Sequence, residues 1–215
     1  MQRTFITYDD TNKISLADGI KQQKLSNSIV RINANLSMLP SNWNLSLLPD
    51  ILEKYNKNQR SLFFSKLLTP IKNNYNYIII DTPPTLSAFT NNAILASDYV
   101  IMPLQTQEQS FEDSIKFVEY LKGLVKDHHN AFDLLGIIPY VINKHGAIDN
   151  CILKYAKQDF GKAMFHANIY QRARVKRFCK FGIKSEDVWD QRTLKMYDNS
   201  LNEALSRIQL LEEYE

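Results

Sequence analysis

Cysteine, glycine and long apolar runs are scarce in this sequence, and their scarcity excludes several classes of protein. The only cysteines, Cys151 and Cys179, form no C-x-x-C pair and have no histidines at metal-ligand spacing, so neither a disulfide framework nor a zinc site is indicated. No apolar run reaches the roughly 18 residues of a membrane span, and the first five residues lack the apolar core of a signal peptide. We therefore expect a cytoplasmic protein without a membrane partner.

The composition is that of a folded protein with one core. The chain has 215 residues, of which 44% are hydrophobic, and this length suits a single domain. Its net charge is only +3, yet seven Lys or Arg and no acids lie between Phe160 and Ser185, whereas acids outnumber bases by eight to three from Glu186 to Glu215. Such a basic stretch is either a solvated surface or a contact for an acidic partner.

Short apolar runs rich in β-branched residues alternate with helical patterns. Buried strands are predicted at Tyr77–Ile80, Tyr99–Met102 and Leu134–Ile142. A further strand is expected at Leu36–Pro40. Helices are expected where apolar residues recur at helical spacing, namely Leu45–Leu52, Leu62–Leu68, Phe111–Val125, Ile152–Phe160 and Leu194–Leu211. Strands separated by helix-length crossovers predict an α/β fold with a mostly parallel sheet and helices on both faces.

The first of these apolar runs ends in a carboxylate and a rigid turn, Asp81-Thr82-Pro83-Pro84. Ligands bind at the carboxyl edge of open α/β sheets, where an Asp holds Mg²⁺ through water beside nucleotide phosphates. The alternative is that Asp81 only caps the turn or the next helix. Both interpretations stay open on residue type alone.

Three segments in a row resemble the ParA partition ATPases and their cell-division relatives: Tyr77–Pro84, Asn92–Asp98 and Val100–Gln105. In that family a strand ending D-x-P-P is followed by a helix bearing N-A-L-x-A-A-D and a strand ending I-P-V-Q. The resemblance implies a P-loop NTPase-like fold and an ATP- and Mg-dependent partition motor. Such a motor dimerises with itself around nucleotide, coats nucleoid DNA nonspecifically and is released by a centromere-binding ParB-like protein.

The resemblance also implies roles for individual residues. Asp81 would organise the Mg²⁺ shell through water and support catalysis, and the contacts to the nucleotide would come from Asp81, Thr82, Asn143, Tyr170 and Gln171. Tyr170 and Gln171 stand where the family has proline and arginine, which puts the purine-side contacts in doubt. The basic stretch is expected to bind the phosphate backbone of DNA without reading its sequence, through Arg172, Arg174, Lys176, Arg177 and Lys180.

One family feature is not in the sequence. Family members begin with a strand and the loop K-G-G-x-G-K-[ST], which binds phosphate and Mg²⁺. The chain has six glycines, and its single Gly-Lys pair, Gly161-Lys162, is followed by Ala163. We therefore interpret residues 1–215 as a single ParA-like domain that is N-terminally incomplete. Alone it should bind ATP weakly or not at all, and the neighbours of the first strand should be left unpaired.

Other functions compete with this interpretation. Truncation, an internal start codon, a decayed gene or a natural relative without a phosphate site would each explain the sequence, so ATPase activity stays uncertain. The main alternative is a non-enzymatic DNA-binding or regulatory protein. A division-site selector is disfavoured because the C-terminal residues 210–215 are acidic rather than a basic amphipathic helix, and an iron–sulfur partner because the cysteines are not paired in spacing.

Overall fold

The computed structural model describes residues 14–41, 46, 48–83, 85–129 and 132–213. The described residues divide into two compact units. We call those up to Asp98 the N-terminal unit and those from Tyr99 onward the C-terminal unit. The single domain expected over residues 1–215 stays a prediction.

A parallel three-stranded sheet forms the centre of the C-terminal unit. The strands β3 (Tyr99–Gln105), β4 (Asp133–Ile142) and β5 (Ile169–Tyr170) lie in the order β3-β4-β5, and both pairs are parallel. The predicted strands at Tyr99–Met102 and Leu134–Ile142 are confirmed. Parallel neighbours require crossover connections, and helices supply them here.

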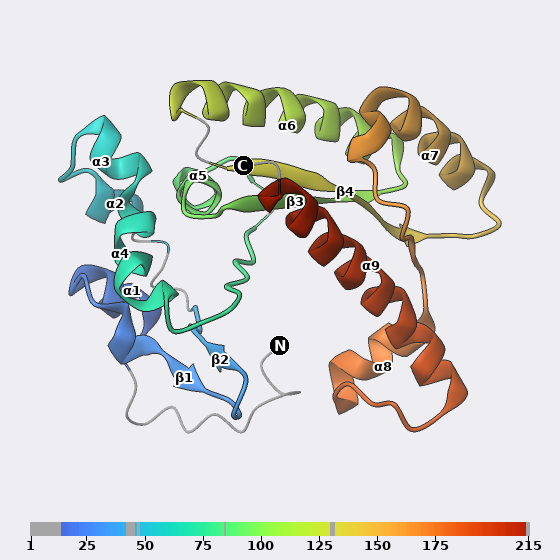
Figure 1. Cartoon of the computed structure of the whole chain (residues 1–215), viewed down its shortest axis with the longest axis horizontal. Helices are drawn as coiled ribbons and strands as arrows, with labels where there is room; N and C mark the ends of the chain where they lie inside the picture. The colour runs from blue at the N-terminus through green and yellow to red at the C-terminus, as the bar shows by residue number, and fades with distance from the viewer. Residues whose placement is uncertain (1–13, 42–45, 47, 84, 130–131, 214–215) are drawn as a thin grey trace. The chain divides into compact units, whose positions relative to one another are not determined.

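Helices cover both faces of this sheet (Figure 1). On one face lie α6 (Glu108–Asp127) and α7 (Ala147–Phe160), packed on a cluster that contains Met102, Leu104, Ile137, Ala156 and Met164. On the other face α9 (Val188–Glu212) packs through Ala204 on Leu135 and Phe165. A 3-10 turn at Gly161–Ala163 and the helix α8 (Ala173–Phe181) complete the described unit. The predicted α/β fold with helices on both faces is therefore confirmed.

A bulge in β4 brings α9 close to the sheet. Val100 pairs with Leu134 and Ile101 with Gly136, so that Leu135 is an extra residue in β4. Gly136 has a φ of 153°, and a Cβ there would lie 2.6 Å from the Ala163 carbonyl oxygen and 2.7 Å from Arg207 Nη1. Only glycine fits this close approach.

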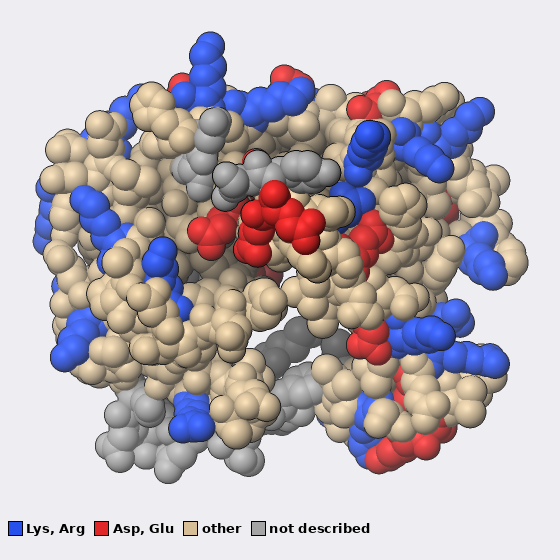
Figure 2. Space-filling model, in the orientation of Figure 1, with Lys and Arg blue, Asp and Glu red and all other residues tan. Residues whose placement is uncertain are grey.

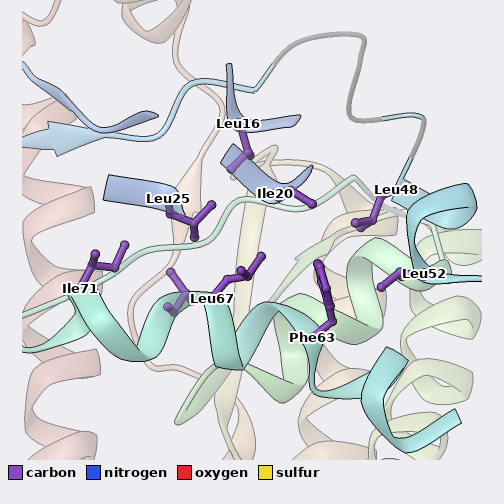
Figure 3. Packing of buried hydrophobic residues seen from close by; sticks show 9 residues of the cluster. Leu16, Ile20, Leu25, Leu48, Leu52, Phe63, Leu67 and Ile71 are labelled. Carbon is purple, nitrogen blue, oxygen red and sulfur yellow. The ribbon is translucent and has the colours of Figure 1, made fainter. Parts of the chain in front are cut away.

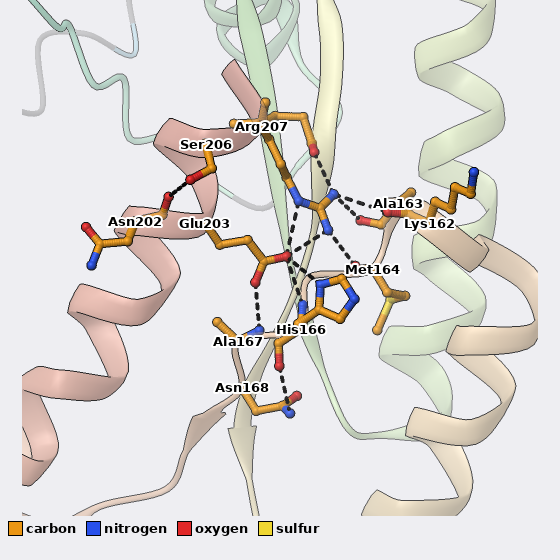
Figure 4. A network of polar contacts seen from close by, with 11 residues as sticks. Lys162, Ala163, Met164, His166, Ala167, Asn168, Asn202, Glu203, Ser206 and Arg207 are labelled. Atoms are coloured by element: carbon orange, nitrogen blue, oxygen red, sulfur yellow. Dashed lines mark hydrogen bonds and ion pairs between the residues drawn. The ribbon is translucent and has the colours of Figure 1, made fainter. Parts of the chain in front are cut away.

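Arg207 uses that space to join three segments of the unit (Figure 4). Its guanidinium donates to the carbonyl oxygens of Leu135 at 3.1 Å and Met164 at 2.7 Å and to Glu203 at 2.8 Å. Glu203 in turn accepts the backbone N–H groups of His166 at 2.9 Å and Ala167 at 2.8 Å. Burial alone would raise the pKa of Glu203, but these hydrogen bonds outweigh it and hold the pKa below its usual value.

The N-terminal unit is mostly helical. It contains α1 (Leu16–Lys21), a 3-10 turn (Leu25–Ser28), the antiparallel pair β1 (Val30–Arg31) and β2 (Ser37–Met38), α2 (Leu48–Leu52), α3 (Lys57–Ser61), α4 (Phe63–Lys72) and α5 (Ala88–Leu95). Its core joins apolar residues of α1, α2 and α4, as Figure 3 shows for Leu16, Leu48, Leu52, Phe63 and Leu67. The strand predicted at Leu36–Pro40 contains β2, and the helix predicted at Leu45–Leu52 is confirmed from Leu48; Leu45 lies outside the described residues.

The prediction of a buried strand at Tyr77–Ile80 is wrong. These residues are assigned to no strand, and Tyr77 is 65% and Ile79 92% exposed. A strand needs a neighbour that pairs with its backbone groups, and among the described residues no strand pairs with this segment. Tyr77, Ile78 and Ile79 are therefore exposed to solvent, and Ile80 packs in part against the core of the unit.

Candidate functional site

The carboxyl ends of β4 and β5 bring together three of the residues predicted to bind nucleotide. Ile142 pairs with Tyr170, and the backbone N–H of Gln171 donates to the Ile142 carbonyl oxygen at 2.9 Å. Asn143 follows Ile142 directly, so the side chains of Asn143, Tyr170 and Gln171 start from one edge of the sheet. Two amides and a phenol supply the donors and acceptors that a nucleotide base requires.

A second β4 irregularity lies immediately before this edge. The register of β4 against β5 shifts between Tyr140 and Ile142, and Val141 between them has a φ of 57°. This region is unfavourable for a β-branched residue. Backbone strain and bulges of this kind are concentrated near functional sites, where they redirect the residues that follow.

Asp149 ties the ends of β3 and β4 to α7. Its Oδ1 accepts the Thr106 hydroxyl, directly after β3, and the backbone N–H of Asn143 at 2.8 Å. The hydrogen bond from Thr106 and then that from Asn143 hold the pKa of Asp149 below its usual value. Asp149 therefore stays ionised and fixes the backbone of Asn143.

Sequence reasoning missed both Thr106 and Asp149. Two signals were present. Thr106 is the first residue after a strand end, and Asp149 is an acid in the first turn of a helix, where an acid is favoured.

Asp81 and Thr82 lie in the N-terminal unit, directly after the Tyr77–Ile80 segment. The carboxylate of Asp81 is exposed and has no hydrogen bond or ion pair within the described residues. The next helix, α5, is capped by Ser87, whose hydroxyl accepts the Thr90 N–H at 3.5 Å. The helix-capping role considered for Asp81 is thus filled by another residue, and its oxygens are available to a cation or to water.

A groove of about 600 Å³ adjoins Asp81 within the same unit. Its lining is mainly apolar and includes Leu16, Met38, Leu68, Ile78 and Ile80, together with Asp81 and Thr82. No lysine or arginine is among the described residues that line it. The carboxylate of Asp81 suits a hydrated Mg²⁺, but the described lining of this groove offers no positive charge to a triphosphate.

The basic stretch forms α8 and its approach. The side chains of Arg172, Lys176, Arg177 and Lys180 are exposed, whereas Arg174 is only partly so. Where α8 and the beginning of α9 lie, in the lower right of Figure 2, basic and acidic side chains adjoin each other. The predicted DNA-binding residues thus share one helix, and Arg174 differs from the others in its surroundings.

Two findings bear on metals and membranes. Among the described residues, no group of three or more His, Cys, Asp or Glu side chains is arranged to hold a metal ion. In the same part of the chain, no helix has both the length and the apolar character needed to cross a bilayer.

Known proteins are similar to this chain over most of its length. The family described as AAA domain matches residues 3–134, which is more than half of the chain. The chromosome-partitioning ATPase Soj of Treponema pallidum is 24% identical over 159 residues, 73% of this chain and 62% of that protein. The chromosome partitioning protein ParA of Myxococcus xanthus is 28% identical over 132 residues, 61% of this chain and 46% of that protein. The chain thus spans about half to two thirds of the length of these relatives.

Solved structures agree on the fold. An ATP complex of McdA from Cyanothece matches with a TM-score of 0.81 and 20% identity, over 93% of this chain and 78% of that one. At this identity the likeness shows the P-loop NTPase fold and nothing finer. The family match shows that the chain belongs to the AAA domain family, and its similarity to the two partition ATPases supports a ParA-type member of that family.

Proposed function

We propose that this protein serves DNA partition as a ParA-like ATPase that binds Mg-ATP, dimerises, binds DNA without sequence preference and responds to a centromere-binding partner. The observation that carries the proposal is the convergence of Asn143, Tyr170 and Gln171 at the β4–β5 edge, where Asp149, itself bonded to Thr106, fixes the Asn143 backbone. Binding at the carboxyl edge is the rule for open α/β sheets.

The described residues suit the Mg²⁺ ion and the base of Mg-ATP better than its phosphates. ATP and Mg²⁺ would supply the phosphoryl group and its charge neutralisation; Asp81 would hold the Mg²⁺ shell through water, and Asn143 and Gln171 would contact the base. The apolar groove beside Asp81 does not fit the phosphates. The 215-residue chain alone should therefore show a flat thermal shift with millimolar Mg-ATP. A shift of several degrees would contradict this part of the proposal.

The role of Asp81 is testable in a form of the protein extended by the family's phosphate-binding segment. Asp81→Ala should lower ATP hydrolysis roughly ten- to a hundredfold, because the carboxylate organises the Mg²⁺ shell and its water. Asp159→Ala, which removes an exposed carboxylate from α7, should leave turnover unchanged and serves as the control. Equal turnover in all three proteins would remove Asp81 from the mechanism.

DNA binding by α8 is tested by its salt dependence. Each phosphate contact releases counterions, so log K should fall with log salt at a slope of about −0.9 per contact. Lys176→Ala or Arg177→Ala should make that slope shallower by about 0.9 on duplexes of unrelated sequence. Lys54→Ala, an exposed cation of the N-terminal unit, is the matched control. A slope unaffected by either α8 variant would leave the basic surface merely solvated.

A non-enzymatic regulator that binds DNA is the second candidate. The absence of cations from the described lining of the groove beside Asp81 favours it for this chain. Measuring DNA binding with and without ATP distinguishes the regulator from the ATPase. A regulator keeps its salt-dependent DNA binding when Asp81 is replaced and shows no change of binding with ATP.

A further inference from the structure

Arg174 lies on the side of α8 that faces α9, whereas Lys176 and Lys180 lie on other sides of the helix. It shares its face with Phe178, one helical turn later, whose side chain is buried. The Arg174 side chain is 22% exposed, and α8 contacts α9. Arg174 therefore points toward α9, whereas Lys176, Arg177 and Lys180 are exposed.

Two carboxylates from the start of α9 hold the Arg174 guanidinium. Nη2 lies 2.5 Å from Asp187 Oδ2, and Nη1 lies 3.3 Å from Asp190 Oδ1. Asp187 is also the N-cap of α9, because its Oδ1 accepts the Asp190 N–H at 2.8 Å. The side chain of Asp190 is 5% exposed, and Arg174 is its ion-pair partner among the described residues.

These contacts leave Arg174 poorly suited to bind phosphate. One positive charge already faces two negative ones, so the three side chains together carry a net negative charge. A DNA phosphate would have to displace a carboxylate and then lie beside it, and like charges at such distances repel. Among the described residues, Lys176, Arg177 and Lys180 form no ion pair, although Arg177 lines the same pocket as Asp187 and Asp190.

We infer that Arg174 is a positioning residue, whose ion pairs with Asp187 and Asp190 fix α8 against α9 and present Lys176, Arg177 and Lys180 to DNA without a phosphate contact of its own. This inference rests on the proposed DNA-binding function. It assigns to Arg174 a role opposite to the phosphate contact expected from the sequence.

The test compares a single with a double variant of the full chain. Arg174→Met leaves the buried Asp190 unpaired, whereas Arg174→Met with Asp190→Leu removes both charges and replaces them by packing groups of similar size. Removing one partner of a buried pair is strongly destabilising, but replacing both is often tolerated. Asp187 remains in both variants and continues to cap α9.

Two quantities are measured, hydrogen exchange of the α8 amides and the salt slope of duplex binding. In Arg174→Met, exchange should quicken about tenfold or more, and affinity should fall by a similar factor at every salt concentration, with the slope unchanged. The double variant should regain slow exchange and affinity to within about threefold, again with the parental slope. Lys176→Ala should leave hydrogen exchange of α8 unchanged and make the salt slope shallower by about 0.9.

Each contrary result has a distinct meaning. A double variant that stays weak and loses about 0.9 of slope overturns the inference, because Arg174 then contacts phosphate. Unchanged exchange in Arg174→Met overturns it as well. If neither the parent nor Lys176→Ala shows salt-dependent DNA binding, the proposed function fails, while hydrogen exchange still decides whether Arg174 positions α8.

Discussion

The β4 strand of the C-terminal unit and the Tyr77–Ile80 segment of the N-terminal unit are both rich in isoleucine, yet β4 buries its isoleucines far more completely. Ile137 in β4 is 0% exposed, whereas Ile79 is 92% exposed. β4 has a hydrogen-bonded strand on each side, and the Tyr77–Ile80 segment pairs with no strand of the described chain. Apolar side chains are thus buried by a strand only where its backbone groups also find partners.

The comparison is tested most directly by one substitution in each region. Ile137→Ala should lower the free energy of unfolding by about 4 kcal/mol, since it removes buried atoms and leaves a cavity. Ile79→Ala should change it by less than about 0.5 kcal/mol, as for an exposed site. Urea unfolding of both variants measures the difference. A large loss in Ile79→Ala would show that this segment is covered in solution.

Arg207→Ala is expected to have the next largest effect. It removes the hydrogen bonds to Leu135 and Met164 and breaks the ion pair between Arg207 and Glu203, and the expected loss is about 3 kcal/mol. Lys122→Ala, which breaks the exposed pair with Glu119, is the control and should cost less than about 0.5 kcal/mol. Equal losses in the two variants would mean that the Arg207 contacts do not hold α9 to the sheet.

Acid should weaken the C-terminal unit through Glu203. Its pKa is lowered from an ordinary value of 4.5, so its contribution is complete above that pH and is lost as pH falls through the folded pKa. The effect should be on the order of 1 kcal/mol after solvent screening. Glu203→Gln lacks this contribution, and the stability gap between parent and variant should narrow between pH 6 and pH 3. A gap that stays constant would contradict the assignment.

The smallest expected effect on stability concerns Val141, at the second irregularity of β4. Val141→Gly relieves an unfavourable φ worth about 1–3 kcal/mol but adds about 0.5–1 kcal/mol of backbone entropy cost and loses some packing, so the net change should be close to zero. Val100→Gly in β3 has no strain to relieve and should be destabilising by about 2 kcal/mol. Equal losses at both positions would show that Val141 is unstrained.

The spacing of apolar residues predicted those helices and strands whose pattern is complete within the element itself. The helical spacing from Phe111 to Val125 predicted α6, and the β-branched run Leu134–Ile142 predicted β4, because both patterns are complete within the element. The same reasoning failed at Tyr77–Ile80, since pairing depends on another strand. The short α8 and β5 were not predicted from residue pattern, and β5, with two residues, is too short to show a period.

The candidate site could be predicted only in part from the sequence, because its contacts also join segments that are distant in the chain. Asn143, Tyr170 and Gln171 were placed by resemblance, and the parallel pairing of β4 with β5 unites them. The hydrogen bond between Thr106 and Asp149 joins residues 43 positions apart. The ion pairs of Arg174 with Asp187 and Asp190 depend on a turn that returns the chain to α8. No spacing rule in the sequence reveals either contact.

The exposed isoleucines before Asp81 should affect how the newly made chain interacts with chaperones. A short, uncharged, β-branched segment with open backbone groups is the kind of site that holdase chaperones bind and that other chains join by strand pairing. The yield of soluble chain during synthesis should therefore depend on how much chaperone is available and on how quickly this segment gains a partner. A quality-control system would recognise the protein by Tyr77–Ile80 while that partner is lacking.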